Sequence, residues 1–394
     1  MKNTTVLISG ASIAGPALAC WLVRYGFSVT IVERAEGRMR PGGQAVDVRG
    51  PALEVIERMG IADAVRAGNT GMRGMTMVDG TGAELYSSTE HTFTGGDLAS
   101  ADVEIMRDDL ALLLQEAAGD EVEYLTGDSI ASLTEDADGV HVTFEKAAPR
   151  RFDLVVGADG LHSTVRSLAF GPERDYISHL GTYLGVFTAP NFLGLENWQM
   201  FCQAGAIGGG MMSARNNTEC RVYIGFESEE PVEYDYRDVE QQKRILAERL
   251  EGAGWEFPKA LTYSWDAPDF SFDSMSQIHL DRWSRGRVVL IGDAGYCGSP
   301  MSGQGTSMAL VGAYVLAGEL KAAAGDHETA FASYEREIRG YVAQNQQLAL
   351  TNRARVEAQT RAAMDGAEVS EPVEITTDPE DFGTVVGALV LKDY

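Results

Sequence analysis

Two continuous apolar runs near the start of the chain flank a segment with helical periodicity. The apolar runs are Thr4–Ser9 and Phe27–Glu33, and Ile13–Tyr25 between them has apolar residues at helical spacing. This order predicts a βαβ unit, whose two strands lie parallel in one sheet. Two later apolar runs, Phe152–Val156 and Val288–Ile291, are predicted to return to that sheet.

Residues 175–280 follow a different pattern. They hold short strand-like segments rich in Phe, Tyr, Trp and Met, with one helical segment near 238–251. Short strands without intervening helices indicate an antiparallel sheet, so this stretch is predicted to be a second domain. Two strand-like pieces upstream, 75–78 and 84–87, are assigned to the same domain.

The remaining elements complete an α/β fold, in which an antiparallel sheet domain is inserted into a Rossmann-like domain with C-terminal helices. Ser129–Lys146 is predicted to be a hairpin, and the Gly- and Arg-rich residues 34–50 a loop. Helices are expected at 51–59, 108–118, 305–323 and 328–364. The predicted domains are a discontinuous first domain at 1–73, 97–174 and 281–325, a second domain at 74–96 and 175–280, and a C-terminal helix and tail at 326–394.

Composition narrows the range of partners. The formal net charge of −26 argues against binding to a nucleic-acid backbone. The four cysteines and six histidines are scattered, which predicts reduced thiols and no metal site. No apolar run reaches the length of about 18 residues that a membrane helix needs, and Arg24 interrupts the apolar N-terminus that a signal peptide would require. The chain is therefore expected to be cytoplasmic, without membrane insertion.

The turn after the first strand resembles a dinucleotide fingerprint. Gly10 and Gly15 are the outer glycines of G-x-G-x-x-G, Ser12 replaces the middle one, and Glu33 ends the second strand, where an acid binds ribose hydroxyls. Two alternatives are a plain strand–helix turn and, because Gly10-x-Ser12-x-Ala14 is similar to a nucleophile elbow, a hydrolase. No acid and histidine downstream pair convincingly with Ser12, which counts against the hydrolase.

Two further glycine-containing segments follow apolar strands. In residues 157–166, Asp159 and a glycine form a turn, Ser163 can cap the next helix, and Arg166 supplies a cation. The alternative is a capped loop with a surface arginine. In residues 287–305, Asp293 ends a strand and a new helix begins near Thr306, whose free N–H groups and positive end suit a polar ligand.

Together these three segments resemble the FAD-dependent aromatic hydroxylases, the para-hydroxybenzoate hydroxylase-like flavoprotein monooxygenases. The likeness is strongest to the tetracycline-degrading and polyketide-tailoring members, and it covers roughly residues 4–365. The matching motifs are the modified fingerprint, G-A-D-G-x-x-S-x-V-R at 157–166, and G-D-A…P…G-x-G at 292–305, in the family's order. Tyr296 departs from the family, which commonly has histidine at that position.

The resemblance implies a role for each matching residue. Asp159 would serve the pyrophosphate region and the nicotinamide cofactor, and Asp293 the ribityl or ribose hydroxyls. Arg107 would contact the flavin, unless it is only a surface charge at a helix start. The adenosine half of FAD would be held by Gly10, Ser12, Gly15, Glu33 and Arg34. Asp47 and Arg49 would face the cofactor, and Pro300, Gly303 and Gly305 would lie beside the isoalloxazine ring.

The resemblance also implies the reaction. A monooxygenase of this family takes NADPH or NADH as a transient reductant and O2 as co-substrate, and it hydroxylates through a flavin C4a-hydroperoxide without an obligatory catalytic side chain. The single fingerprint leaves no separate nicotinamide domain, as in the family. The chain is expected to be a monomer or weak dimer, and its role in antibiotic biosynthesis or resistance stays open.

The second domain would supply the substrate pocket. Its aromatic and Met-rich strands suggest a large, flat, apolar aromatic or polyketide-like substrate, and Arg215 could orient an acidic group. The candidate substrate residues are Phe187, Met200, Met211, Arg215, Tyr223 and Pro300, with Trp198, Met212 and Phe226 on the same strands. The alternative for each is ordinary sheet core. Alternative functions are a flavin-dependent oxidase or reductase, or a flavoprotein that binds a hydrophobic ligand without turnover.

Overall fold

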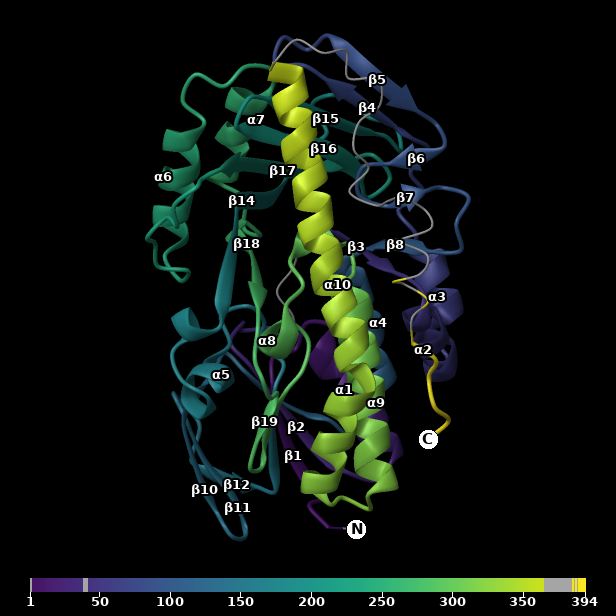
Figure 1. The fold of residues 1–394 in the computed structure, drawn as a ribbon, viewed down its shortest axis with the longest axis vertical. Coiled ribbons are helices and arrows are strands. Elements are labelled where there is room, and N and C mark those ends of the chain that lie inside the picture. The colour runs from purple at the N-terminus through teal and green to yellow at the C-terminus, as the bar shows by residue number, and fades with distance from the viewer. Residues whose placement is uncertain (1, 38–41, 365–384, 386, 388) are drawn as a thin grey trace.

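The computed structural model describes residues 2–37, 42–364, 385, 387 and 389–394, with the backbone alone for 356–364. Its lower half in Figure 1 is built on a six-stranded sheet, parallel except for one edge strand. The order is β19 (Ser284–Arg285), β20 (Val288–Leu290), β13 (Leu154–Gly157), β1 (Thr5–Ser9), β2 (Ser28–Glu33) and β9 (Glu123–Thr126). The prediction that the four apolar runs share one parallel sheet is confirmed.

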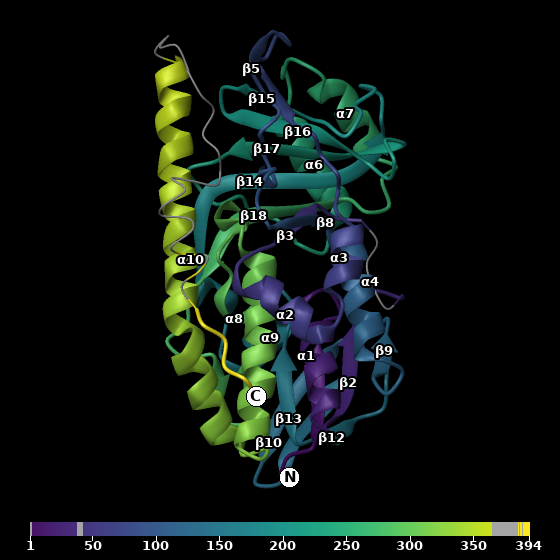
Figure 2. The same cartoon turned by 90° about the vertical axis from the view of Figure 1, so that its right-hand side faces the viewer.

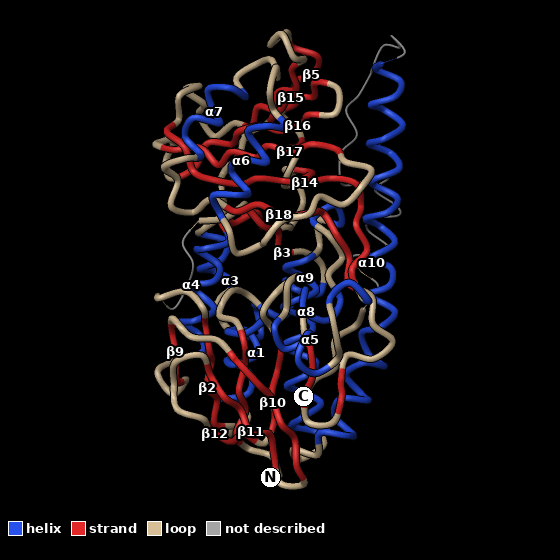
Figure 3. Tube along the Cα trace, turned by 90° about the vertical axis from the view of Figure 1, so that its left-hand side faces the viewer, coloured by secondary structure: helices blue, strands red, loops and turns tan. Residues whose placement is uncertain are grey.

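Helices cover one face of this sheet. Helix α1 (Ala14–Arg24) packs between α4 (Arg107–Ala118) and α9 (Gly305–Ala322). From Ser307 to Leu320 every residue of α9 is buried, as expected for a helix that is apolar on all sides. The other face carries a three-stranded sheet of β10 (Ile130–Asp136), β11 (Gly139–Phe144) and β12 (Arg150–Phe152), seen in front in Figure 3.

The predicted strand Phe152–Val156 is wrong in one respect, because it belongs to two sheets. Phe152 ends β12, and Leu154 begins β13 of the six-stranded sheet. Between them the Asp153 carboxylate accepts hydrogen bonds from the backbone N–H and the hydroxyl of Thr5, both at 2.8 Å. This anchorage turns the chain from one sheet into the next.

The upper half is a seven-stranded sheet with one helix-covered face. Its order is β18 (Ser271–Ile278), β14 (Ile177–Pro190), β17 (Glu219–Glu227), β16 (Ile207–Ala214), β15 (Gln199–Ala204), β4 (Met75–Val78) and β5 (Glu84–Ser88). All neighbours are antiparallel except β15 and β4. Helices α6 (Val239–Arg249) and α7 (Phe257–Ser264) pack on the outer face. The predicted α/β class is confirmed.

A two-stranded ribbon lies between the two halves. It pairs β3 (Ala45–Val48) with β8 (Val103–Met106), so the predicted loop at 34–50 contains a strand that sequence reasoning missed. Nearby are the helices α2 (Pro51–Met59) and α3 (Ala62–Ala67) and the short strands β6 (His91–Thr92) and β7 (Gly96–Asp97). Figure 2 shows the ribbon directly below the seven-stranded sheet.

Helix α10 (His327–Met364) runs along both halves of the molecule (Figures 1 and 2). It packs against α9 and against the loop that precedes α9. The last six residues, 389–394, return to α9, where Tyr394 and Lys392 bond Glu319. Within the described residues, no helix combines the length and apolar character needed to cross a lipid bilayer.

Candidate active site

The three sequence motifs meet at one edge of the six-stranded sheet. Strands β1, β13 and β20 are parallel neighbours, so the turns that follow them begin at the same edge. The Ala158 N–H donates to the carbonyl of Ser9 at 2.9 Å, and the Ile291 N–H donates to the carbonyl of Gly157, also at 2.9 Å. In open α/β sheets, ligands bind at this carboxyl edge.

The fingerprint glycines are required by close backbone packing. Gly10 has a φ of +105°, and a Cβ there would lie 2.4 Å from the carbonyl oxygen of Ala158. A Cβ on Gly15 would lie 2.0 Å from the carbonyl oxygen of Gly10. The first glycine therefore brings two motifs together, and the second lets α1 pack on β1.

Glu33 lies beside the fingerprint turn. Its carboxylate accepts hydrogen bonds from the N–H groups of Ala11 at 2.9 Å and Ala35 at 2.8 Å. Each carboxylate oxygen retains a lone pair for a further donor such as a ribose hydroxyl. The neighbouring Arg34 is exposed, and its guanidinium lies 6.0 Å from the ring centre of Tyr236.

Arg107 connects the fingerprint to the loop before β3. It is the first residue of α4, and its guanidinium donates to the Ser12 hydroxyl at 3.0 Å and to the Gly42 carbonyl at 2.7 Å. The alternative of a free surface charge is therefore wrong. The glycine pair Gly42–Gly43 was a missed signal: a Cβ on Gly43 would lie 2.3 Å from the Arg107 guanidinium.

Asp159 organises the start of helix α5 (Thr164–Ala169). It accepts from the Ser163 hydroxyl at 2.5 Å and from the Val165 N–H at 3.1 Å, and burial raises its pKa. Ser163 caps α5, as predicted, by accepting from the Arg166 N–H at 2.9 Å. Asp159 thus shapes the turn between β13 and α5.

Arg166 is completely buried, so the surface-arginine alternative is wrong. Its guanidinium donates to the Ala294 carbonyl at 3.0 Å and forms a 2.6 Å ion pair with Glu173 in the short 3-10 helix Glu173–Asp175. Burial lowers the pKa of Arg166, while the charge of Glu173 opposes that change. Through Ala294 it joins the second motif to the third.

Asp293 begins the short helix α8 (Asp293–Tyr296), after Gly292 with a φ of +58°. Its side chain is exposed, yet the protein around it raises its pKa by desolvation. Asp293 therefore presents hydrogen-bond acceptors to a bound molecule.

The loop after α8 leads into the open first turn of α9. It contains the 3-10 helix η2 (Pro300–Ser302) with exposed Pro300, followed by Gly303 at a φ of +62°. A Cβ on Gly305, the first residue of α9, would meet no atom within 4 Å. The space beside Gly305 is therefore open, and the N–H groups of the first turn, which have no partner within the helix, begin next to it.

Asp47 and Arg49 are buried rather than open to this space. Arg49 is 1% exposed and pairs with the Asp47 carboxylate at 3.0 Å. The Arg49 backbone N–H donates to the Ser307 hydroxyl in the first turn of α9, at 3.0 Å. The pair therefore lies behind the first turn of α9.

The predicted substrate residues do not form one lining. Phe187 and Met211 are buried in the cluster beneath α6 and α7, and Met200 packs against the same cluster, so these predictions are wrong. Tyr223 lies in the opposite cluster, on the inner face of the sheet. Arg215 lies in the turn between β16 and β17 and pairs with Asp108 and Asp109, so this guanidinium is already engaged within the protein.

Three inner-face residues were missed: Met72, Val186 and Phe201. They form one cluster with the predicted Tyr223 and with Met212, which was named on the same strands. The signal was the two-residue alternation of a strand, which places Val186 and Phe187, or Met211 and Met212, on opposite faces.

These features fit FAD. The accessible acceptors on Asp293 and the lone pairs on Glu33 match the hydroxyl groups of that cofactor, and the open α9 turn matches the carbonyl groups of its ring. Tyr296 does not disturb this arrangement, because its buried ring packs 4.6 Å from Trp283 and its hydroxyl lies 3.0 Å from that of Tyr334.

Relatives in sequence include two flavin-dependent monooxygenases. A family model described as an FAD binding domain matches residues 3–349. A flavin-dependent monooxygenase from an unknown prokaryotic organism is 42% identical over 341 residues, covering 86% of this chain and 87% of the relative. A second, from Legionella longbeachae, is 39% identical over 345 residues, with 88% and 87% covered. An uncharacterized protein of Mycobacterium tuberculosis is 51% identical over 390 residues, with 99% and 100% covered.

Solved structures share the whole architecture. The tetracycline destructase Tet(51) superposes with a TM-score of 0.86 at 33% identity, and both chains are covered completely. Tet(55) superposes with a TM-score of 0.83 at 36% identity, again with both chains covered completely. Together with the site geometry, these likenesses establish that the chain belongs to the FAD-binding-domain family and is an FAD-dependent monooxygenase.

Proposed function

We propose that this enzyme hydroxylates an aromatic or polyketide-like substrate with O2 and uses NADPH or NADH as its transient reductant. The observation that carries the proposal is the open first turn of α9 beside the accessible carboxylate of Asp293. Two of the solved structures with this fold are tetracycline destructases, which supports a polycyclic substrate rich in oxygen. A role in antibiotic resistance would fit these relatives, and a role in polyketide tailoring stays open.

The residues at the sheet edge would hold the two ends of FAD. Asp293 would accept hydrogen bonds from the ribityl chain, and Arg107, which donates to Ser12, would bind on the flavin side of that residue. The adenosine end would be held by Gly10, Ser12, Gly15, Glu33 and Arg34. When bound, FAD would supply the redox chemistry that activates O2.

The start of α9 would stabilise negative charge on the cofactor ring. Pro300, Gly303 and Gly305 would lie along the ring, and the free N–H groups of the first turn would point toward it. A helix N-terminus stabilises a nearby anion by about 1 kcal/mol when the site is partly buried. No side-chain nucleophile is needed for this role.

The substrate would lie against the inner face of the seven-stranded sheet. Val186, Phe201, Met212 and Tyr223 form a buried apolar cluster on this face, which would keep water from the reacting groups. Pro300 would border the same space from the ring-side loop. Phe187, Met200, Met211 and Arg215 are not part of this proposal, because the structure places them elsewhere.

Oxygen-18 labelling tests the function directly. The FAD-loaded protein is incubated with NADPH, labelled O2 and a panel of polyphenols and tetracyclines, and we expect one labelled atom in a product. NADPH oxidation without label in any product would indicate an oxidase or reductase instead. Absence of substrate-stimulated NADPH oxidation would indicate a non-catalytic binding protein.

A matched pair of variants tests the cofactor site. Asp293→Ala should weaken FAD binding by at least about tenfold, because hydrogen bonds to a charged acceptor are lost. Asp63→Ala removes an exposed carboxylate on α3 and should leave FAD affinity unchanged. Equal FAD affinities, measured by flavin fluorescence, would remove Asp293 from the site.

A further inference from the structure

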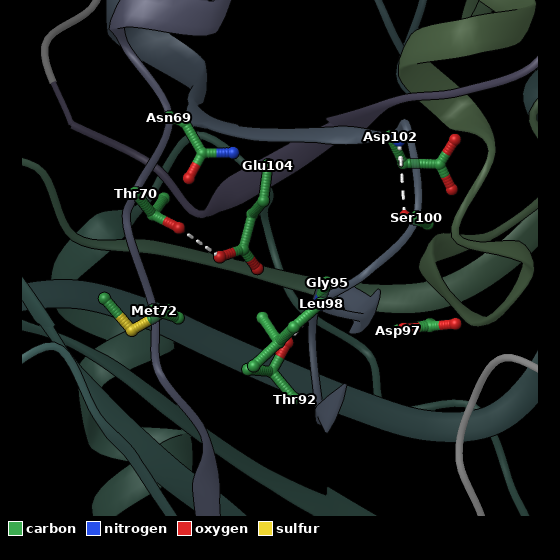
Figure 4. A pocket seen from close by; sticks show the side chains of 10 residues that line it. All are labelled: Asn69, Thr70, Met72, Thr92, Gly95, Asp97, Leu98, Ser100, Asp102 and Glu104. Atoms are coloured by element: carbon green, nitrogen blue, oxygen red, sulfur yellow. Dashed lines mark hydrogen bonds between the residues drawn. The ribbon is translucent and has the colours of Figure 1, made fainter. Parts of the chain in front are cut away.

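A polar cavity lies beside the ribbon that separates the two halves, and Glu104 on β8 points into it. Its volume of about 100 Å³ leaves room for a group of several non-hydrogen atoms. Figure 4 shows the Glu104 carboxylate directed from the strand toward the middle of the ring of lining residues. The polar part of the wall is formed by Asn69, Thr70, Asp97, Ser100, Asp102 and Glu104.

The hydrogen bonds around Glu104 have a fixed direction. The side-chain oxygen of Gln199 accepts from the N–H groups of Phe93 at 3.0 Å and Thr94 at 3.3 Å, so its amide nitrogen donates to the Thr94 hydroxyl at 2.5 Å. Because the Thr94 oxygen accepts that bond, its hydrogen is directed to one oxygen of Glu104. The Thr70 hydroxyl donates to the other oxygen at 2.5 Å. Each carboxyl oxygen receives a donor and keeps a lone pair, an arrangement that suits the ionised form.

The described part of the chain places no cation next to this carboxylate. Glu104 is 7% exposed, and no described Lys, Arg or His nitrogen lies within 4.0 Å of its oxygens or of those of Asp97. Arg49 lies 3.5 Å from the third carboxylate of the wall, that of Asp102, and it also pairs with Asp47 at 3.0 Å. Buried charges in proteins are ordinarily paired. Burial raises the pKa of Glu104 and that of Asp102, and a bound cation would offset this cost.

The chemistry of the wall suits an organic cation better than a metal ion. The described side chains offer no group of three or more His, Cys, Asp or Glu residues that could hold a metal. The acceptors are instead spread around the cavity, on the loop after α3, on the segment after β7 and on β8. An ammonium group, whose N–H donors point in several directions, matches acceptors that are spread in this way.

The cavity shares residues with the apolar cluster on the inner face of the seven-stranded sheet. Met72 lines the cavity and also belongs to that cluster. Thr92 and Gly95, in the hairpin of β6 and β7, line the cavity as well, whereas Phe93 between them stacks on Phe201 of the cluster with ring centres 4.2 Å apart. An apolar surface beside a few fixed polar groups is typical of a small-molecule site.

We propose that this cavity is a subsite for a protonated amine of the substrate, whose ammonium group is bound by Glu104 and Asp102. The inference rests on the monooxygenase activity of the proposed function, and it names the substrate class: a polycyclic molecule that carries a basic amine. The ammonium N–H groups donate to the remaining lone pairs of the carboxylates, and such charge-assisted hydrogen bonds are the strong ones. Binding of the amine in the cavity orients the rings on the apolar cluster.

A pair of small probes tests cation binding without turnover. Benzylamine is protonated at neutral pH, whereas benzyl alcohol has nearly the same shape and no charge. Calorimetry of the FAD-loaded protein is carried out in about 0.15 M salt, which screens the attraction of distant surface charges. The Kd of benzylamine should be at least about tenfold lower than that of benzyl alcohol. Equal Kd values for the wild-type protein overturn the proposal.

Matched variants locate the binding. Glu104→Gln keeps the size of the side chain and an acceptor for Thr70, and the preference for benzylamine should disappear. Asp102→Asn should weaken the preference and replaces Glu104→Gln if that variant does not fold. Asp63→Asn removes an exposed carboxylate on α3 and should keep the preference. A preference that survives in both cavity variants overturns the assignment to this cavity.

The substrate class is tested with amine-bearing compounds and the same compounds without the amine, such as tetracycline with and without its dimethylamino group. For the wild-type enzyme the KM of the amine-free compound should be at least about tenfold higher. In Glu104→Gln the two KM values should be equal, and FAD affinity should not change. Equal KM values in the wild type, or labelled oxygen only in amine-free compounds, overturn the substrate class while the proposed function stands. No labelled oxygen in any product contradicts the proposed function instead, and the preference for benzylamine still reports the cation site.

Discussion

Tyr296 fills a space that a glycine on the neighbouring helix leaves open. A Cβ on Gly312 of α9 would lie 2.0 Å from the Tyr296 hydroxyl oxygen. The tyrosine cannot easily move away, because Trp283 packs against its ring and Tyr334 of α10 lies 3.0 Å from its hydroxyl. Tyr296 and Gly312 therefore act as a matched pair between α8 and α9.

This pairing predicts that the effect of Gly312→Ala on stability depends on the residue at position 296. In the wild-type background the added methyl group should lower the free energy of unfolding by about 1–3 kcal/mol, because overpacking outweighs the better helix propensity of alanine. In a Tyr296→Phe background the same substitution should cost less, since the hydroxyl is gone. Urea denaturation of the four proteins measures the difference.

A glycine on α10 provides the control for this experiment. A Cβ on the exposed, helical Gly340 would meet no atom within 4 Å. Gly340→Ala should therefore stabilise the protein by about 0.5–1 kcal/mol. An equal cost of Gly312→Ala in both Tyr296 backgrounds would contradict the pairing.

Single residues were predictable from sequence when their partners were local. Ser163 precedes a helix and caps it three residues later, as the pattern predicted. Arg166 was not predictable, because its partners include the carbonyl of Ala294, 128 residues away. Tyr296 likewise depends on Gly312 and Tyr334, which only the fold brings near.

At the scale of elements, His162 joins four separate segments. It belongs to the turn before α5 and hydrogen-bonds Glu173 of the 3-10 helix at 2.8 Å and Asp273 of β18 at 3.1 Å. Its ring stacks on Tyr236, in the connection between β17 and α6, with ring centres 4.4 Å apart. Burial lowers the pKa of His162, but the hydrogen bonds and charges of Asp273 and Glu173 outweigh it and raise the pKa to about 9.

The raised pKa predicts a loss of stability in weakly alkaline solution. The folded protein binds this proton more tightly than the unfolded chain, whose histidine pKa is about 6.5. The stabilisation is therefore complete below about pH 6.5 and is lost as the pH rises through 9. We expect the free energy of unfolding to fall by about 1–3 kcal/mol over this range.

Two variants assign that pH dependence. His162→Gln should flatten the stability profile between pH 6.5 and 9 in denaturant titrations at several pH values. His141→Gln removes an exposed histidine that pairs only with Asp136 among the described residues, so it should leave the profile unchanged. A profile that keeps its slope in His162→Gln would assign the effect to another group.

The sequence predicted which segments are strands better than it predicted which face of a sheet each side chain occupies. The apolar runs identified the strands of the parallel sheet, because strands buried on both faces lack polar interruptions. In the seven-stranded sheet both faces carry apolar residues, so composition could not separate Val186 from Phe187. The short strand β3 was missed because the glycines before it marked a loop, although Ala45-Val-Asp-Val48 alternates as a strand does.

At the scale of the whole molecule, residues 392–394 connect helices α2, α9 and α10. We call these three residues the C-terminal clip. The Tyr394 ring lies where a Cβ on Gly318 of α9 would be, at 2.1 Å, and its hydroxyl donates to Glu319 at 2.8 Å. Lys392 pairs with Glu319 at 2.9 Å and with Glu337 of α10 at 2.7 Å. The Arg58 guanidinium on α2 donates to the Lys392 carbonyl at 2.8 Å.

Loss of these C-terminal contacts should lower the free energy of unfolding without changing the affinity for FAD. Tyr394→Ala should lower the free energy of unfolding by about 2–4 kcal/mol, because a packed aromatic ring and a hydrogen bond are lost. FAD affinity should stay the same, since the ring lies far along α9 from Gly305. Asp393→Asn is the control, because this carboxylate is 95% exposed. A drop in FAD affinity equal to the drop in stability would contradict this separation.

The fold class of the whole molecule was predicted from the sequence, but the long-range contacts of its C-terminal residues were not. The alternation of strands and helices indicated the α/β class, and the motifs indicated the edge where the ligand binds. The acidic end of the chain gave no pattern, because its partners lie on α2, α9 and α10. Residues 365–384 of that predicted tail lie outside the described part of the chain.

Helix α10 has a mechanical consequence. With 38 residues it is about 57 Å long, and it is fastened at several points. Gln346 donates to the carbonyls of Ile278 and Cys297, and Asn352 donates to the carbonyl of Met301 in the 3-10 helix before α9. A hinge rotation of one half against the other would bend this rod or strip those bonds. Because α10 resists rotation of the two halves, we expect molecules to enter and leave the site through movement of local loops, which costs less free energy.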